Sequence, residues 1–325
     1  MTLSVGVLMD PIDQIKIAKD TSFAMLLEAQ RRGHSLHYFE QGGLALRNGE
    51  PWARIAPLTV REDAGDWFTL GPAQWRDLRE LNVVLMRKDP PVDAQFIYDT
   101  MVLEVAQRGG VAVINDPQAL RDCNEKLFAL AFPQCIAPAI VSRDAAELRR
   151  FTAEHGEVVL KPLDGMGGRG IFHVKAGDSN LNSMLETLLG GDAHGHGRQL
   201  TIAQKFIPEI NAGDKRILVI DGEPVPYALA RIPQGDEFRG NLAAGGRGEG
   251  VALTDHDRWI VSQVAPELRR RGLFFVGLDV IGNYLTEINV TSPTCVRELD
   301  AQFGLNIAGQ LFDVIDQHVT GNRNA

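Results

Sequence analysis

The fold of this 325-residue chain is decided by residues 158–174, VVLKPLDGMGGRGIFHV. Four of the six residues 165–170 are glycine, and the segment literally matches the dinucleotide-binding pattern G-x-G-x-x-G. That pattern opens a helix in its usual setting, whereas residues 171–174 continue as an apolar strand. A Walker A loop is also excluded, because Ile171 follows Gly170 where such a loop has lysine. We therefore expect a glycine-rich loop between two antiparallel strands, with backbone N–H groups free to contact phosphate oxygens.

Lys161 makes the phosphate interpretation more specific. It ends the strand predicted over residues 158–160 and stands four residues before Gly165. An ammonium group at that position can reach a phosphate held by the loop. The alternative is a flexible hairpin loop beside a solvated lysine, which explains each feature separately but not their combination.

A second glycine-rich segment lies at residues 240–250, where five of eleven residues are glycine. Small residues without periodicity do not form a core, so we expect this segment to be mobile when no ligand is bound. Arg231, Arg239 and Arg247 would allow it to close over an anionic substrate. A surface linker is the alternative, although a linker in an acidic protein has little reason to carry three arginines.

Asp279, Glu287 and Asn289 are candidate ligands for a magnesium ion. Glu287 and Asn289 alternate with apolar residues, so their side chains lie on one face of a predicted strand. Two carboxylates and an amide oxygen are hard ligands, which suit Mg²⁺ bridging nucleotide phosphates. Asp279 shares that face only if the intervening turn is the three-residue loop 282–284 or if a strand carries a bulge. A solvated strand face is the alternative.

Toward the N-terminus the sequence predicts one α/β domain. Its first 39 residues have the strand–helix–strand order of a βαβ unit, and Thr21 or Ser22 is the expected cap of the helix. Turn signals at residues 48–49 and 71–72 precede the next strand. The expected strands cover residues 3–9, 35–39, 81–86 and 111–114, and the expected helices cover residues 21–32 and 94–108.

A helix over residues 121–131, which carries Lys126, begins a mixed α+β region. From residue 158 onward, short apolar strands alternate with glycine-rich turns, and the region is expected to divide into two lobes. The polar residues 320–325 are expected to fray. The expected strands cover residues 158–160, 171–174, 217–220, 225–230, 273–281 and 285–290, and the expected helices cover residues 145–155, 181–189 and 258–271.

Composition and charge exclude several classes of protein. Thirty-three Lys+Arg against 42 Asp+Glu give a net charge of −9, which argues against a nucleic-acid partner. The first ten residues have no signal-peptide features, and no apolar run approaches the roughly 18 residues of a membrane span. Cys123, Cys135 and Cys295 are too few and too far apart for a disulfide framework or a C-x-x-C zinc site. His194 and His196 lie in a glycine-rich stretch that is expected to be an exposed loop. These features predict a cytoplasmic protein without nucleic-acid or membrane partners.

Taken in order, nine segments of the chain resemble the bacterial glutathione synthetase family of the ATP-grasp superfamily. The similarity runs nearly from end to end, and the ordered set is far more specific than any one segment. The clearest departure is the slightly extended loop around His194 and His196, which lies away from every motif. The nine segments are MDP (9–11), DTSFAMLLEAQRRG (20–33), MRKDPP (86–91), LRDCNEKL (120–127), LKPLDGMGG (160–168), GDKR (213–216), ARIPQG (230–235), GNLAAGGRGEG (240–250) and EINVTSPT (287–294).

The resemblance implies an ATP-grasp fold, α/β plus α+β, with an N-terminal α/β (pre-ATP-grasp) domain. The N-terminal domain would cover residues 1–122 and the central ATP-grasp lid subdomain residues 123–203. The C-terminal ATP-grasp subdomain would cover residues 204–325 and include the substrate loop 232–247.

The resemblance also implies a role for each site residue. Arg216 and Arg231 would be catalytic, facing the transferring phosphoryl group and the acyl phosphate. ATP would be bound by Lys126, Lys161, Gly165, Met166, Gly167, Gly168, Gln204, Lys205, Phe206 and Ile207, the last four forming the hinge that contacts adenine. The peptide substrate would be bound by Arg239, Gly240 and Asn241. Two Mg²⁺ ions, for which Mn²⁺ is a possible substitute, would be held by Asp279, Glu287 and Asn289.

The implied reaction is the ATP-dependent ligation of γ-glutamylcysteine and glycine to glutathione through an acyl phosphate, with release of ADP and phosphate. The resemblance further implies a homo-oligomer, a tetramer. Two alternatives stay open. One is an ATP-grasp ligase that joins a different acid to a different amine. The other is a nucleotide-binding or regulatory protein without turnover, which would have little need of the metal pair Glu287 and Asn289.

Overall fold

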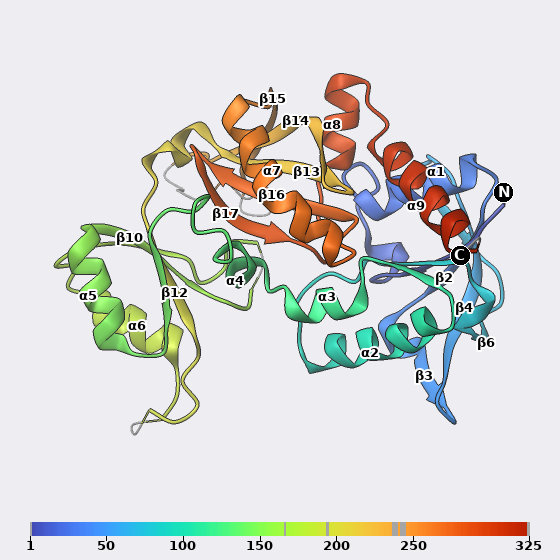
Figure 1. Ribbon diagram of the computed structural model, residues 1–325, viewed down its shortest axis with the longest axis horizontal. Coiled ribbons are helices and arrows are strands. Elements are labelled where there is room, and N and C mark those ends of the chain that lie inside the picture. Colours follow the sequence, from blue (N-terminus) through green and yellow to red (C-terminus); the bar gives the residue numbers. More distant parts are fainter. Residues whose placement is uncertain (1, 166, 193–194, 236–239, 241–244, 324–325) are drawn as a thin grey trace.

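The structure is a computed structural model that describes residues 2–165, 167–192, 195–235, 240 and 245–323. Within these residues the strands form sheets of eight, four and five strands. Figure 1 shows the eight-stranded sheet at one end of the molecule and the four-stranded sheet at the other, with the five-stranded sheet between them.

The N-terminal sheet is built around parallel pairings of β1 with β2, β1 with β7 and β7 with β8. Four of the five β1 residues are buried, because α2 packs on one face of the sheet while α1 and α9 pack on the other. The predicted strand–helix–strand order is therefore confirmed. The elements are β1 (Ser4–Leu8), α1 (Thr21–Arg31), β2 (Ser35–Phe39), β7 (Val83–Met86), α2 (Ala94–Arg108), β8 (Ala112–Ile114) and α9 (Ile307–Arg323).

Between β2 and β7 the chain adds four antiparallel strands that the sequence did not predict. The longest of them, β4, pairs with β2 and extends the parallel sheet. Its side chains alternate between buried and exposed over much of its length, as expected for a strand with one face on the core. The strands are β3 (Leu44–Arg47), β4 (Glu50–Val60), β5 (Phe68–Leu70) and β6 (Gln74–Asp77).

The four-stranded sheet contains the first glycine-rich loop. β10 and β11 are antiparallel, with Leu160 opposite Phe172, so the predicted loop between two antiparallel strands is confirmed. Val158 and Leu160 are buried under α5 and α6, and the alternating residues Val159 and Lys161 face away from these helices. The elements are β9 (Ala139–Ser142), α5 (Ala145–His155), β10 (Glu157–Pro162), β11 (Phe172–Lys175), α6 (Leu181–Leu189) and β12 (Thr201–Lys205), with strand order β11-β10-β12-β9.

The five-stranded sheet is antiparallel throughout, in the order β15-β14-β13-β16-β17. Residues 240–250 were expected to be a mobile segment outside any core, but their C-terminal part belongs to the sheet, because Arg247–Ala252 form β15 and pair with β14. The elements are β13 (Asp214–Ile220), β14 (Glu223–Ile232), β15 (Arg247–Ala252), α7 (Asp255–Arg270), β16 (Phe275–Ile281), β17 (Tyr284–Asn289) and α8 (Val296–Phe303).

Two helix predictions need correction. The helix expected over residues 121–131 is two short helices, α3 (Pro117–Asp122) and α4 (Glu125–Ala129), because Asn124 Oδ1 accepts from the backbone N–H groups of Lys126 and Leu127 and begins a new helix. The cap of α1 is Asp20, whose Oδ1 accepts from Phe23 N at 2.6 Å. Short 3-10 helices cover Ile12–Gln14, Gln41–Gly43, Leu78–Glu80 and Pro208–Ala212.

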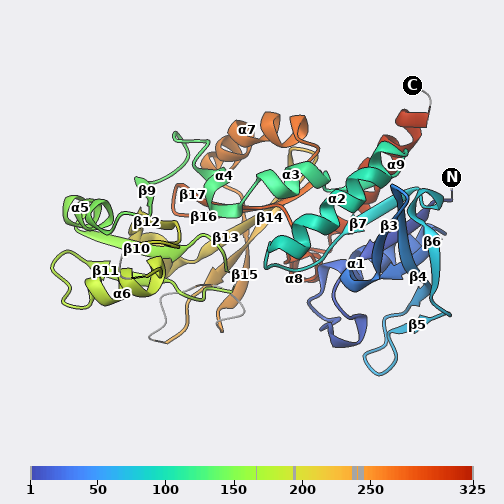
Figure 2. The same cartoon turned by 90° about the horizontal axis from the view of Figure 1, so that it is seen from below.

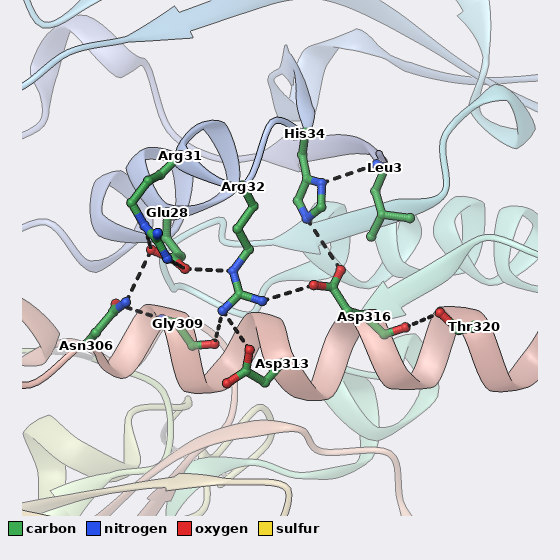
Figure 3. A network of polar contacts seen from close by, with 10 residues as sticks. All are labelled: Leu3, Glu28, Arg31, Arg32, His34, Asn306, Gly309, Asp313, Asp316 and Thr320. Atoms are coloured by element: carbon green, nitrogen blue, oxygen red, sulfur yellow. Dashed lines mark hydrogen bonds and ion pairs between the residues drawn. The ribbon is translucent and has the colours of Figure 1, made fainter. Parts of the chain in front are cut away.

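The C-terminal helix α9 returns to the N-terminal domain and packs on α1, as the two views of the molecule show (Figures 1 and 2). It extends to Arg323, so the expected fraying is wrong for residues 320–323, while residues 324–325 lie outside the described residues. Arg32 connects the two helices, because its guanidinium pairs with Glu28 at the end of α1 and with Asp313 and Asp316 on α9 (Figure 3). None of the helices in the described ranges is long and apolar enough to cross a membrane.

Candidate active site

A pocket of about 290 Å³ receives side chains from both the four-stranded and the five-stranded sheet. Val159 and Gln204 reach it from the four-stranded sheet, and Arg216 and Glu287 reach it from the five-stranded sheet. Asp89 and Pro90, which follow β7 of the N-terminal sheet, also line it. The pocket therefore lies where segments from all three sheets meet, although these segments are far apart in sequence.

The two predicted phosphate lysines converge on one carboxylate. Nζ of Lys126 and Nζ of Lys161 each lie 3.9 Å from Oε1 of Glu287. Lys126 also contacts the neighbouring Glu125 and the carbonyl oxygen of Gly165, the latter at 3.4 Å. Burial opposes the charged form of Lys126, but Glu287 and Glu125 outweigh it and raise the pKa of its ammonium group. Lys126 thus keeps its positive charge although its side chain is only 6% exposed.

The first glycine-rich loop borders the pocket. Gly165, Gly167 and Gly168 line it, and their φ angles of +136°, +67° and +80° lie in a region that side chains with a Cβ rarely adopt. The glycines thus allow the backbone to follow the pocket wall in a conformation that would be strained for residues with a Cβ. Met166 lies outside the described residues.

The predicted adenine hinge lies at the end of β12. Gln204, Lys205, Phe206 and Ile207 all line the pocket. The N–H groups of Lys205 and Phe206 already donate to the carbonyl oxygens of Pro138 and Glu157. Because the protein itself occupies these two N–H donors, a base bound at the hinge must form its hydrogen bonds with other groups.

Arg216, Arg231 and Asp279 form a buried ion cluster on the five-stranded sheet. Arg216 donates from Nε and Nη2 to the two carboxylate oxygens of Asp279 at 2.6 and 2.7 Å, and Arg231 Nη2 lies 2.9 Å from Oδ2. Burial disfavours the charged carboxylate, but the two arginines prevail and hold the pKa of Asp279 below its usual range. Both guanidinium groups are thereby fixed at the pocket wall, where both residues are lining groups.

The register of β16 and β17 decides the geometry of the candidate metal ligands. Ile281 pairs with Tyr284, so the turn has two residues and the three-residue loop is not formed. A register shift after Asp279 makes Thr286 the extra residue and sets Asp279 opposite Glu287. The bulge, the other predicted condition, is therefore confirmed, and Asp279 and Glu287 share one face of the sheet.

The donor set at this face suits a hard cation that also binds phosphate. Asn289 Nδ2 donates to the carbonyl oxygen of Gly277 at 3.3 Å, which leaves its Oδ1 as an acceptor beside Glu287. Within the described part of the chain, no three His, Cys, Asp or Glu side chains gather as a metal centre. A cation here would thus depend on Glu287, Asn289, Asp279 and the ligand's own oxygens, as Mg²⁺ with a nucleotide does.

The remaining predicted residues divide into described and undescribed ones. Gly240 lines the pocket, and a Cβ added to it would meet the carbonyl oxygen of Arg231 at 2.2 Å. Arg239 and Asn241 lie outside the described residues, as does His194. His196 is 81% exposed and pairs with Asp192, in keeping with the expected exposed loop.

Sequence reasoning gave no role to two partly buried acids that line the pocket, Glu125 and Asp214. Burial, with the charge of Glu287 nearby, raises the pKa of Glu125 to about 7. Burial also raises the pKa of Asp214 to about 6, against the influence of Arg231. A usable signal was their spacing, because Glu125 precedes Lys126 directly and Asp214 alternates with Arg216 on β13.

Comparisons with known proteins agree on one family. Residues 3–121 match the family described as "Prokaryotic glutathione synthetase, N-terminal domain", and residues 125–304 match "Prokaryotic glutathione synthetase, ATP-grasp domain". A glutathione synthetase of Xanthomonas axonopodis pv. citri is 69% identical over 316 residues, 97% of this chain and 98% of its own. That of Escherichia coli O157:H7 is 54% identical over 314 residues, 97% of this chain and 98% of its own.

Two solved structures, the first of an ATP-grasp ligase, show the likeness in fold. PsnB, complexed with a minimal precursor, Mg and ADP, is 18% identical with a TM-score of 0.60, covering 97% of this chain and 98% of its own. D-cycloserine synthetase DcsG is 15% identical with a TM-score of 0.64, covering 97% of this chain and all of its own. The expected α/β plus α+β architecture with an ATP-grasp fold is therefore confirmed.

Proposed function

The chain belongs to the prokaryotic glutathione synthetase family, and from this premise we propose how its residues carry out the family's reaction. The activity is the ATP-dependent ligation of γ-glutamylcysteine and glycine to glutathione, with release of ADP and phosphate. A carboxylate is a poor electrophile until one of its oxygens is phosphorylated. Phosphoryl transfer from ATP gives an acyl phosphate, and the glycine amine then displaces phosphate to form the amide.

The observation that carries the assignment of residues is the convergence of Lys126, Lys161, Arg216 and Arg231 on a pocket bordered by a glycine-rich loop. Phosphoryl transfer needs positioning and charge neutralisation more than covalent help from the protein. In our proposal the two lysines hold the nucleotide phosphates under Gly165, Met166, Gly167 and Gly168. The hinge residues Gln204, Lys205, Phe206 and Ile207 hold the base.

Arg216 and Arg231 would neutralise the transferring phosphoryl group and the acyl phosphate. Their guanidinium groups are held by Asp279, so they need little reorganisation when negative charge develops nearby. Arg239, Gly240 and Asn241 would contact the peptide substrate. Glu287, Asn289 and Asp279 would hold Mg²⁺, two ions in our proposal with Mn²⁺ as a substitute, which neutralises phosphate charge when bound.

We also propose the organisation of the chain around this site. Residues 1–122 form the N-terminal domain, residues 123–203 the lid subdomain, and residues 204–325 the C-terminal subdomain with the substrate loop 232–247. We further propose a cytoplasmic homotetramer, which multi-angle light scattering of the purified protein would test.

The experiment that tests the function is ADP release measured across a panel of acids and amines, with mass identification of each product. We expect γ-glutamylcysteine plus glycine to stimulate ADP release and to yield glutathione, and we expect little product when either one is omitted. Stimulation by a different acid–amine pair, with none by this one, would contradict the assignment. ATP binding without turnover on any pair would support a non-catalytic protein.

A further inference from the structure

We infer that His173 is a positioning residue for the base of the nucleotide, acting through the ring of Phe206. This inference rests on the proposed function, because it takes the slot beside Phe206 to be the adenine site. The imidazole of His173 stacks on the Phe206 ring with centroids 3.9 Å apart and planes inclined by 18°. Phe206 lines the pocket, whereas His173 stands behind it and outside the lining.

The strand register places His173 on the pocket face of the four-stranded sheet. On β10, Val159 lies opposite His173 of β11 on one side and opposite Gln204 of β12 on the other. Residues opposite one another in a sheet point to the same face, so these three side chains form one row. Val159 and Gln204 both line the pocket. The row thus continues the pocket wall outward to the imidazole. Figure 2 shows the three strands that carry it, β11, β10 and β12, as neighbours.

Glu157 connects both members of the stack. Its backbone carbonyl accepts the N–H of Phe206 at 3.0 Å, and its Oε2 lies 3.5 Å from Nε2 of His173. Lys175, the strand partner of Glu157, holds the other carboxylate oxygen at 2.8 Å. One residue therefore fixes the backbone of Phe206 and contacts the ring that packs on its side chain.

The stack stands just beyond the end of β12, because Phe206 follows Lys205, the last residue of that strand. A stacked partner limits the orientations of the ring and presents a fixed flat surface to the pocket. Bases pack well on such surfaces because every base has a π-face. A surface ordered in advance also avoids part of the entropy lost when the ligand binds.

The chain offers a matched control for this contact. His155 at the end of α5 also packs on a phenylalanine, Phe151, with centroids 4.2 Å apart. Both residues belong to the helix that covers the opposite face of the same sheet, and neither lines the pocket. Replacing His155 therefore removes the same kind of contact from the same sheet without touching the nucleotide slot.

The test compares the wild type with His173→Ala, His173→Phe and His155→Ala. For His173→Ala we expect the KM for ATP to rise about two- to ten-fold, the range of one aromatic contact, with kcat changed less than two-fold. Inorganic tripolyphosphate has no base, so its inhibition constant against ATP should stay within two-fold of the wild type. His173→Phe keeps a flat ring and should restore the KM, and His155→Ala should leave it unchanged.

Three outcomes would overturn the inference. They are an unchanged KM for ATP in His173→Ala, an equal loss of tripolyphosphate affinity, and a His173→Phe variant that binds ATP no better than His173→Ala. Thermal unfolding of each variant separates these results from a general loss of structure. Failure of the proposed function is distinguishable, because the wild type itself would then release no ADP with γ-glutamylcysteine and glycine.

Discussion

At the scale of single residues, Glu287 connects the two lysines of the site with the candidate metal ligands. It faces the ammonium groups of Lys126 and Lys161 at 3.9 Å, and it lies opposite Asp279, whose own charge is taken up by two arginines. The oxygens of Glu287 are therefore freer for a cation than those of Asp279. Replacing the carboxylate with an amide of the same shape separates its charge from its packing.

We expect Glu287→Gln to lower kcat at least about 100-fold while the protein stays folded, because the variant loses a charged oxygen ligand but keeps its volume. ADP release titrated with Mg²⁺ measures the effect, and circular dichroism checks the fold. Glu223→Gln is the control, since the side chain of Glu223 is 78% exposed and should tolerate the change. Wild-type turnover in Glu287→Gln would contradict the ligand assignment.

Gly240 is a second residue whose identity the geometry demands. A Cβ at this position would meet the backbone oxygen of Arg231, which cannot rotate away as a side chain would. We expect Gly240→Ala to displace the Arg231 backbone and to lower kcat/KM for γ-glutamylcysteine at least about ten-fold, with a smaller effect on ATP binding. Steady-state kinetics with each substrate varied in turn measures both effects.

Gly321→Ala is the control for this prediction, because a Cβ at Gly321 meets nothing within 4 Å. Kinetic constants should match the wild type in that variant. If Gly240→Ala raised the KM for ATP and the KM for the peptide equally, the assignment of Gly240 to the peptide side of the pocket would be wrong.

At the scale of elements, the second glycine-rich segment has two parts with different reasons for their glycines. Gly248 and Gly250 lie in β15, where an added Cβ would meet Leu229 at 3.2 Å and the ring of Phe303 at 2.2 Å. Phe303 belongs to α8 and stacks on Tyr227 of β14 with centroids 3.7 Å apart. Gly250 therefore allows α8 to approach β15 closely, and Gly248 makes room for a side chain of the neighbouring strand β14, which is the opposite of a flexible linker.

We expect Gly250→Ala to lower the free energy of unfolding by about 1–3 kcal/mol, because the Phe303 ring is held between Gly250 and Tyr227 and must shift. In a Phe303→Leu background the same change should have a clearly smaller effect, since the shorter side chain leaves room. Urea denaturation of the four proteins measures the coupling. Gly42→Ala, where a Cβ meets nothing within 4 Å, is the control. Additive effects of the two changes would show that the contact does not matter.

The same strand shows what the sequence could predict about elements and what it could not. Regular apolar periods predicted β2, α2, α5 and α6 with the bounds that the structure has. A run of glycines in the sequence indicates a flexible backbone, but it does not indicate that a neighbouring side chain fills the place of the missing Cβ. The strand β15 was therefore not predicted. Asp279 illustrates the site in the same way. Its strand was predictable, but the bulge at Thr286 and the two arginines that hold its carboxylate come from tertiary pairing.

At the scale of the whole molecule, the last helix packs back on the domain that comes first in the sequence. α9 follows residue 304, the end of the ATP-grasp family match, and packs on α1 of the N-terminal domain. Arg32, Asp313 and Asp316 form its charged contacts (Figure 3). This return was not predicted, because Asp313 and Asp316 meet their partner Arg32 only in the folded chain.

His34, at the same contact, makes the stability of the whole molecule depend on pH. Its Nδ1 accepts the backbone N–H of Leu3 at 3.2 Å, which requires that nitrogen to carry no proton, and its Nε2 faces Asp316 at 3.4 Å. Burial lowers the pKa of His34, and Arg32 lowers it further against the opposing influence of Asp316. The folded state thus favours the neutral imidazole more than the unfolded chain does, whose histidine has the ordinary pKa of 6.5.

The sign of the dependence follows from proton binding. Below the ordinary pKa the unfolded chain binds a proton that the folded protein resists, so the stabilisation present above about pH 6.5 is lost as the pH falls. We expect the free energy of unfolding, from urea denaturation at pH 8 to 5, to fall less steeply in His34→Gln than in the wild type. The difference in slope cannot exceed about 1.4 kcal/mol per pH unit, the limit for one proton. The wild type must be compared with the variant because burial also raises the pKa of Asp99 and Asp300 to about 6. These two acids make the free energy of unfolding rise as the pH falls, which is opposite to the effect of His34. The control is His196→Gln, because His196 is exposed, and this variant should keep the wild-type slope. A wild-type slope in His34→Gln would show that protonation of His34 does not affect the α1–α9 contact.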